Sequence, residues 1–235
     1  LWLNPTAIEN LITFLKEQFF LFTYLATWII SVLTYRKYFD TTLKFFPIFI
    51  AYTFFTDLLG YFIKFDNNFQ FFSEGKYASL NIVIYNIYQF AAYLFFYWVY
   101  FKTLKKTKHK QLVKYGTLVT LVAYVANMIF QNPLYRGLYY AELIGSWALL
   151  ACIIFYFQEK KAEPSSYTQW KNLLFWVSAG SFIFYLVTPY IFLIGSMDDH
   201  VWYDYHFQKI LFVLIAIMYG FYMLGLLLGQ RKAYR

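Results

Sequence analysis

The sequence predicts an all-α integral membrane protein, a bundle of seven transmembrane helices that forms one domain over residues 1–235. Two observations predict this class. Hydrophobic residues make up 61% of the chain and charged residues only 14%, far from the balance of a soluble domain. In addition, apolar runs of about 20 residues recur, which is the length that a helix needs to cross the hydrocarbon core of a bilayer.

The apolar runs and their polar flanks set the expected spans. We expect helices at residues 11–34, 44–64, 79–103, 112–131, 137–158, 171–194 and 207–229. The outer part of the first span contains Lys16 and Glu17, which indicates either side chains that reach to the interface or a start nearer Phe19. The short connections leave no room for a sizeable soluble domain such as a kinase core.

Basic residues predict the orientation of the bundle. Fifteen of the 20 Lys and Arg residues fall in alternate connections and in the C-terminal tail, whereas five fall on the opposite side. Because cytoplasmic loops carry an excess of Lys and Arg, we expect the N-terminus outside and the C-terminus in the cytoplasm. The densest basic group, residues 102–114, has a topogenic role on this reading, and it also suits anionic headgroups or a cytoplasmic protein.

The remaining connections fit the same pattern. Asn132-Pro133 marks a short outer turn, and residues 163–166 mark an inner loop. The connection 197–206 holds three carboxylates and two imidazoles, but their spacing matches no specific metal motif. We interpret it as a solvated acidic loop with Trp202 and Tyr203 at the membrane interface.

Polar residues within the spans are the candidate functional residues, because a polar group in hydrocarbon needs a partner or a function. Most of them lie in the outer halves of the spans, whereas the inner halves carry mainly aliphatic and aromatic side chains. Helical spacing brings several onto shared faces, which favours a cavity that opens outward. The predicted ligand-binding residues are Asp57, Asn81, Tyr85, Asn86, Gln89, Asn127, Glu142, Tyr185 and Lys209.

A structural interpretation of the same residues stays open. The amides and hydroxyls are equally suited to hydrogen bonds between helices. In that interpretation Asp57 or Glu142 pairs with Lys209 or is protonated.

Several function classes find no support in the residues. The net charge of +8 resides in the connections, which argues against a nucleic-acid partner. Retinal needs a lysine deep in the last span, whereas Lys209 lies in its first turn and the third span has no acid. We see no serine triad, phosphate-binding loop or catalytic zinc set, so we predict no catalytic residues, no metal and no cofactor, and enzymatic activity is not favoured.

Two short segments carry a family resemblance. Tyr85-Asn86-Ile87-Tyr88 in the third span and the segment 171–176, which opens the sixth span, resemble small seven-helix bacterial membrane proteins and the membrane input domains of sensor kinases. The resemblance implies a bacterial inner membrane and a signalling role, but no residue roles. Because the sequence holds no kinase domain, we expect signal output to need a separate partner or a region outside this sequence.

We therefore expect a sensor or receptor-like protein that binds a small ligand from the outer side and signals to a cytoplasmic partner. A transporter or channel subunit, or a structural subunit of a membrane complex, is the alternative. Small residues four apart in the last span, Ala216 with Gly220 and Gly225 with Gly229, favour close helix packing within the bundle and also suit a homodimer.

Overall fold

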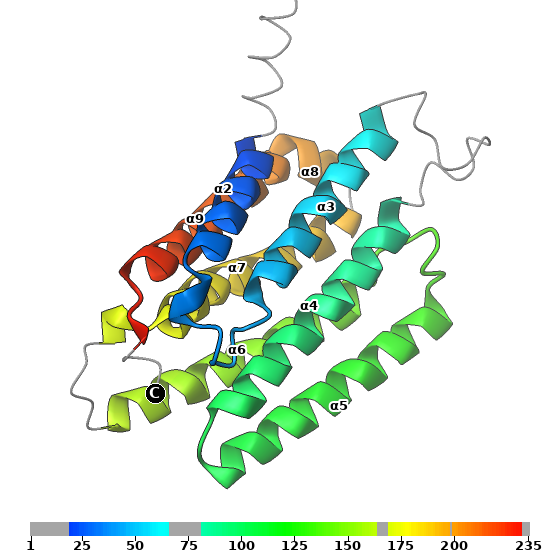
Figure 1. Cartoon of the computed structure of the whole chain (residues 1–235). Coiled ribbons are helices and arrows are strands. Elements are labelled where there is room, and N and C mark those ends of the chain that lie inside the picture. The colour runs from blue at the N-terminus through cyan, green and yellow to red at the C-terminus, as the bar shows by residue number, and fades with distance from the viewer. Residues whose placement is uncertain (1–18, 66–80, 164–168, 198, 232–235) are drawn as a thin grey trace, which may run out of the picture.

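The computed structural model describes residues 19–65, 81–163, 169–197 and 199–231, with the side chains of 61–65, 81 and 199 excepted. Within these ranges the chain is helical and contains no strand (Figure 1). The elements are α2 (Phe19–Leu33), η1 (Tyr35–Lys37), α3 (Phe46–Phe65), α4 (Asn81–Thr103), α5 (Thr107–Phe130), α6 (Tyr139–Ala162), η3 (Gln169–Lys171), α7 (Leu173–Met197), α8 (Asp199–Asp204) and α9 (Phe207–Leu228).

Five of the described helices, α4, α5, α6, α7 and α9, are long and apolar enough to cross a membrane. The predicted all-helical membrane architecture is confirmed at this level. Two shorter apolar helical stretches, Phe19–Leu33 and Phe46–Gly60, occupy the positions of the first two predicted spans. Residues 11–18 of the first predicted span lie outside the described residues.

Helix ends differ from the predicted spans where polar residues continue a helix. α5 begins at Thr107 rather than at residue 112, and α6 continues to Ala162 rather than ending at residue 158. Hydropathy reports only the apolar part of a helix, whereas Lys, Gln and Glu are good helix formers that extend it beyond the lipid. The acidic connection also contains a short helix, α8, which the sequence analysis did not predict.

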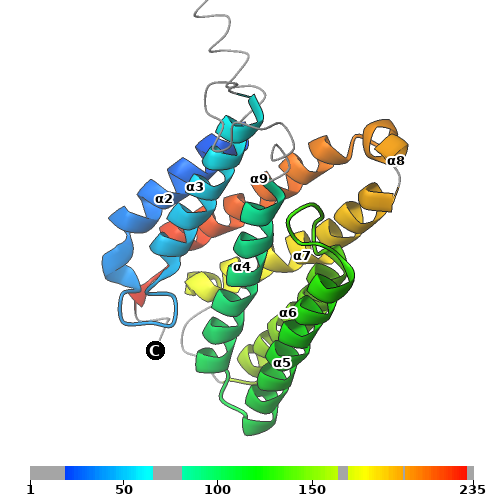
Figure 2. The ribbon, with the colours of Figure 1, turned by 90° about the vertical axis from the view of Figure 1, so that its right-hand side faces the viewer.

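The helices form a closed ring in chain order. Each long helix contacts the next one along the chain, and α9 contacts α2. α4 also contacts α6 directly, so α5 lies on the outside of these two helices (Figure 2). One end of the bundle, here called the basic end, carries η1, the connection 104–106, η3 and the C-terminal end of α9. The opposite end, here called the far end, carries the α5–α6 connection and α8.

Glycines allow α7 and α9 to approach closely. A Cβ atom added at Gly180 would lie 2.8 Å from the Met218 backbone oxygen, and one added at Gly225 would lie 2.7 Å from Trp176 Cβ. By contrast, a Cβ atom at Gly220 would meet nothing within 4 Å. The small residues of α9 therefore include one that packs inside the bundle and one that faces open space.

The core is rich in tyrosine. Eight of its largest fully buried side chains are tyrosines, namely Tyr38, Tyr93, Tyr97, Tyr100, Tyr124, Tyr156, Tyr219 and Tyr222. A tyrosine fills space as phenylalanine does, but its buried hydroxyl needs a hydrogen-bond partner. The interior consequently contains tyrosine hydroxyl groups, although its residues count as aromatic in the composition.

Candidate functional site

A carboxyl group of α3 meets tyrosines of two neighbouring helices towards the far end. Asp57 interacts with the hydroxyls of Tyr24 in α2 and Tyr85 in α4. Tyr24 is 2% exposed, whereas Tyr85 is 36% exposed and Asp57 is half-buried. The carboxyl is thus enclosed by phenols, and Tyr85 is the member of this group with the most exposed side chain.

Tyr88 and Thr53 extend this group into the bundle. The hydroxyls of Tyr88 and Thr53 lie 3.1 Å apart. Because Thr53 Oγ1 donates its proton to the Phe49 carbonyl at 3.0 Å, the Tyr88 hydroxyl is the donor to Thr53. Tyr24, Thr53, Asp57, Tyr85 and Tyr88 are called the Asp57 cluster below.

A second carboxyl group is buried in the first turn of α6. Glu142 is 5% exposed and makes no ion pair with any described residue. It lies within electrostatic range of Tyr93 and Tyr124. The Tyr93 hydroxyl donates to the Glu142 backbone carbonyl at 2.9 Å and lies 2.7 Å from Ser146 Oγ. The partial positive charge at the N-terminal end of α6 favours a carboxylate here.

Unpaired polar atoms occur on the helices beside Glu142. Within the described part of the chain, Tyr124 Oη and Gln89 Oε1 are buried without a hydrogen-bond partner. Gln89 lies one turn before Tyr93 on α4, and the Tyr185 ring of α7 lies 5.5 Å from the Tyr93 ring. Leaving a buried polar atom unpaired costs about 1–3 kcal/mol, so such atoms are typical of sites where a ligand or ordered water supplies the partner.

Tyr88 lies near both Asp57 and Tyr185. It is within electrostatic range of both groups. The structure therefore brings Asp57 together with Tyr85 directly, and it connects them to Tyr185 through a tyrosine that the sequence analysis did not select.

Two of the predicted pocket residues instead hold the α5–α6 connection. Asn86 Nδ2 donates to the backbone carbonyls of Pro133 at 2.9 Å and Arg136 at 3.1 Å, and its Oδ1 accepts from the Leu138 N–H at 3.1 Å. Both N–H donors and the carbonyl oxygen of this amide bind backbone groups, so its observed role is structural.

Asn127 has a related role at the same connection. Its Nδ2 donates to Gln131 Oε1 at 2.9 Å, and its Oδ1 accepts from the Ala141 N–H at 3.0 Å. Asn127 thereby satisfies a backbone donor in the first turn of α6 that has no partner within the helix.

For the last two predicted residues, no contact with either carboxyl group is described. Asn81 begins α4, but its side chain lies outside the described residues. Lys209, in the first turn of α9, is exposed, and no ion pair among the described residues joins it to Asp57 or Glu142.

Hydroxyl pairs continue into the half of the bundle near the basic end. Tyr97 lies 2.8 Å from Thr120, Tyr100 lies 2.9 Å from Ser178, and Tyr222 lies 2.7 Å from Ser181. The sequence analysis treated this half as dry because it counted tyrosine as an aromatic residue. The high tyrosine content, 25 residues, is the signal that indicates otherwise.

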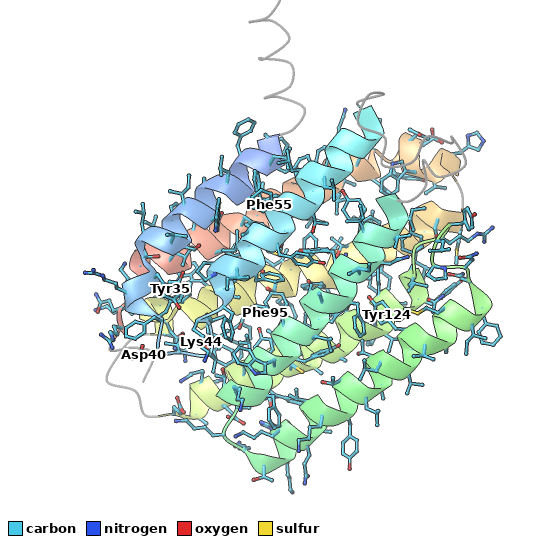
Figure 3. All side chains as sticks on the ribbon, turned by 45° about the vertical axis from the view of Figure 1, so that its right-hand side comes forward. Tyr35, Asp40, Lys44, Phe55, Phe95 and Tyr124 are labelled. Carbon is cyan, nitrogen blue, oxygen red and sulfur yellow. The ribbon has the colours of Figure 1, made fainter. Side chains whose placement is uncertain are left out.

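The basic end contains a polar group that the sequence analysis missed. Glu159 of α6 is 8% exposed and lies 2.7 Å from His109 Nδ1 of α5. At the same end of the bundle, Arg231 Nη2 donates to Asp40 Oδ2 at 3.0 Å, and Figure 3 shows Asp40 beside Lys44 at this end. These contacts join the ends of several helices, whereas the sequence analysis predicted no contacts among the charged residues here.

Comparison with protein-family models, curated proteins and solved structures gave no match. The resemblance to membrane input domains of sensor kinases stays a prediction.

Proposed function

We propose that this chain is a seven-helix sensor or receptor-like membrane protein that binds a small ligand at the Asp57 cluster and signals to a cytoplasmic partner. In this proposal α2 and α3 cross the membrane together with the five longer helices. The N-terminus lies outside, the basic end faces the cytoplasm, and the membrane is the bacterial inner membrane. The positive-inside rule supports this orientation.

The observation that carries the proposal is a carboxyl group shared by three helices. Asp57 interacts with Tyr24 and Tyr85, which belong to α2 and α4. A carboxylate with aromatic rings around it suits a small organic cation, because the carboxylate supplies the opposite charge and ring faces attract cations. The exposure of Tyr85, which interacts with Asp57, supports entry along this tyrosine from the outer side.

α9 is the proposed relay to the cytoplasm. Its Tyr219 ring lies 4.5 Å from the ring of Tyr24 in the Asp57 cluster. At the other end of α9, Lys37 Nζ donates to the carbonyls of Leu226 at 3.3 Å and Leu227 at 3.0 Å. A ligand that moves Tyr24 would shift α9 relative to its neighbours α2 and α7. The ligand would then bind one position of α9 more tightly than the other, and this difference in affinity is what a switch requires.

A thermal-shift screen with small primary amines and quaternary ammonium compounds tests the proposal in detergent-solubilised protein. We expect at least one compound to raise the Tm of the wild type and of Asp40→Asn, but not of Asp57→Asn. Asp40→Asn is the matched control because Asp40 pairs with Arg231 at the basic end. The proposal is wrong if no compound raises the Tm, or if Asp57→Asn responds as strongly as the wild type.

A transporter is the second candidate. The hydroxyl pairs Tyr100–Ser178 and Tyr222–Ser181 favour it, because they continue the polar interior beyond the depth of Asp57. Uptake of the same labelled amine into proteoliposomes distinguishes the two functions. A receptor binds the amine without accumulation inside the vesicles, whereas a transporter accumulates it.

A further inference from the structure

An open groove of about 330 Å³ lies on the surface between α4 and α5. It exists because α5 packs on α6 more closely than on α4. A Cβ atom at Gly116 of α5 would lie 3.3 Å from Ala148 Cβ, and one at Gly145 of α6 would lie 3.2 Å from Thr120 Cγ2. These contacts hold α5 against α6, so the α4 side of α5 is left incompletely covered.

The walls of the groove are apolar. Leu94, Trp98 and Phe101 line it from α4, at positions that share one helix face. Leu118 and Leu121 line it from α5. The seven steps from Leu94 to Phe101 correspond to roughly 10 Å along the helix axis. Because α4 and α5 are among the helices able to cross a membrane, this apolar groove opens towards lipid tails.

Two lysines converge at the end of the groove nearest the basic end. Lys114 Nζ lies 5.4 Å and Lys110 Nζ lies 6.0 Å from the centroid of the Phe101 ring. Neither lysine forms an ion pair with another residue of the described part of the chain. Two positive charges therefore lie near one aromatic ring and form no ion pair with a described carboxylate.

Three other basic residues at this end have ion-pair partners within the protein, whereas Lys106 and Lys108 have none among the described residues. Lys105 and Lys160 both pair with Glu163, and Arg231 pairs with Asp40. The positive-inside rule accounts for the number of basic residues here, but it does not account for two unpaired lysines at the end of an apolar groove.

We propose that the groove binds an anionic phospholipid, with an acyl chain against the Leu94 and Leu118 walls and the phosphate beside Lys110 and Lys114. The apolar walls match the acyl chain, and the two ammonium groups match the negative headgroup. A zwitterionic lipid would bring no net charge to the two lysines. The proposal is independent of the ligand at the Asp57 cluster.

Native mass spectrometry of detergent-solubilised protein with added phosphatidylglycerol or phosphatidylcholine tests the headgroup. We expect the wild type to retain phosphatidylglycerol preferentially, and Lys110→Gln with Lys114→Gln to weaken this preference by about fivefold per lysine. The matched control is Lys106→Gln with Lys108→Gln, which removes the same charge from exposed side chains outside the groove. Equal loss in the two double variants, or no loss in either, would overturn the proposal.

Two adjacent positions, Leu118 and Val119, test whether the groove binds an acyl chain. Leu118 lines it and is 56% exposed, whereas Val119 is 54% exposed and does not line it. We expect Leu118→Trp to reduce retention of phosphatidylglycerol and Val119→Trp to leave it unchanged. If both variants retain the lipid as the wild type does, or if glycerol 3-phosphate displaces it at equal concentration, the groove does not bind an acyl chain and the proposal fails.

Discussion

Glu159 of α6 binds His109 of α5 through a 2.7 Å contact between Oε1 and Nδ1, and the same carboxylate caps the start of α5. It accepts hydrogen bonds from the backbone N–H groups of Lys105 at 2.6 Å and Lys106 at 3.1 Å. α5 has no side-chain cap of its own at Lys106. The His109 ring also stacks on Phe155 at 4.7 Å, so one buried residue of α6 fixes both the backbone and a side chain of α5.

Glu159→Gln tests this cap. The amide keeps one acceptor oxygen but points an NH₂ group at a backbone donor or at His109, and we expect the free energy of unfolding to fall by about 1–3 kcal/mol. Equilibrium unfolding in detergent measures the change. Glu163→Gln is the control, because its ion pairs are more exposed and its expected loss is below about 1 kcal/mol. Equal losses in the two variants would contradict the capping role.

The stability that Glu163 contributes depends on pH. Hydrogen bonds from Lys105 and Lys160 hold the pKa of Glu163 below its ordinary value of 4.5. Because the folded pKa is lower than the unfolded pKa, the contribution is complete above pH 4.5 and is lost as the pH falls through the lowered pKa. We expect wild type and Glu163→Gln to differ slightly in Tm at neutral pH and to converge in acid. A difference that grows on acidification would contradict this sign.

Tyr93 and Tyr124 offer a matched pair beside Glu142. Tyr93→Phe removes a hydroxyl that bonds both Ser146 and the Glu142 carbonyl, so we expect a loss of about 1–2 kcal/mol. Tyr124→Phe removes a buried hydroxyl without a described partner, and we expect no loss or a small gain. Thermal unfolding of both variants measures the difference. A larger loss for Tyr124→Phe would show that its hydroxyl has a partner in solution.

Asn86→Asp separates the structural role of Asn86 from a ligand-binding role. The change keeps the acceptor for Leu138 but replaces the donor to Pro133 and Arg136, and we expect a loss of about 2–4 kcal/mol. Asn127→Asp should cost less, since its carboxylate still accepts from the first turn of α6, where negative charge is favourable. Unfolding measurements give the order, and the reverse order would contradict it.

Gly180→Ala and Gly220→Ala test the contact between α7 and α9. We expect Gly180→Ala to cost roughly 1–3 kcal/mol, because its Cβ atom would overlap the Met218 carbonyl. Gly220 has open space around it, so Gly220→Ala should be neutral or stabilising by up to about 1 kcal/mol. Thermal unfolding measures both. Comparable losses would show that Gly220 is covered in solution, for example by a second copy of the chain.

Residue type alone predicted part of the candidate site. Polarity within apolar spans correctly selected buried residues such as Asn86, Asn127 and Glu142. Polarity alone could not distinguish Asn86, whose amide is bound by backbone groups, from Glu142, whose carboxyl has no ion-pair partner among the described residues. The difference depends on which loop or helix lies opposite each side chain. Polarity also left Tyr24 and Tyr88 out of the predicted ligand-binding residues, since a tyrosine in an aromatic-rich helix gives no indication of where its hydroxyl points.

The sequence by itself determined that the chain is helical and that most of its helices are apolar enough for a membrane. The reason is local. A backbone in lipid must satisfy its hydrogen bonds within its own segment, so an apolar run long enough to cross the bilayer is expected to form a helix. Only the tertiary structure decided that Asp57 meets Tyr24 and Tyr85, and that α5 leaves a groove beside α4. Those contacts join residues far apart in sequence, and small residues such as Gly116 and Gly145 set how closely their helices approach.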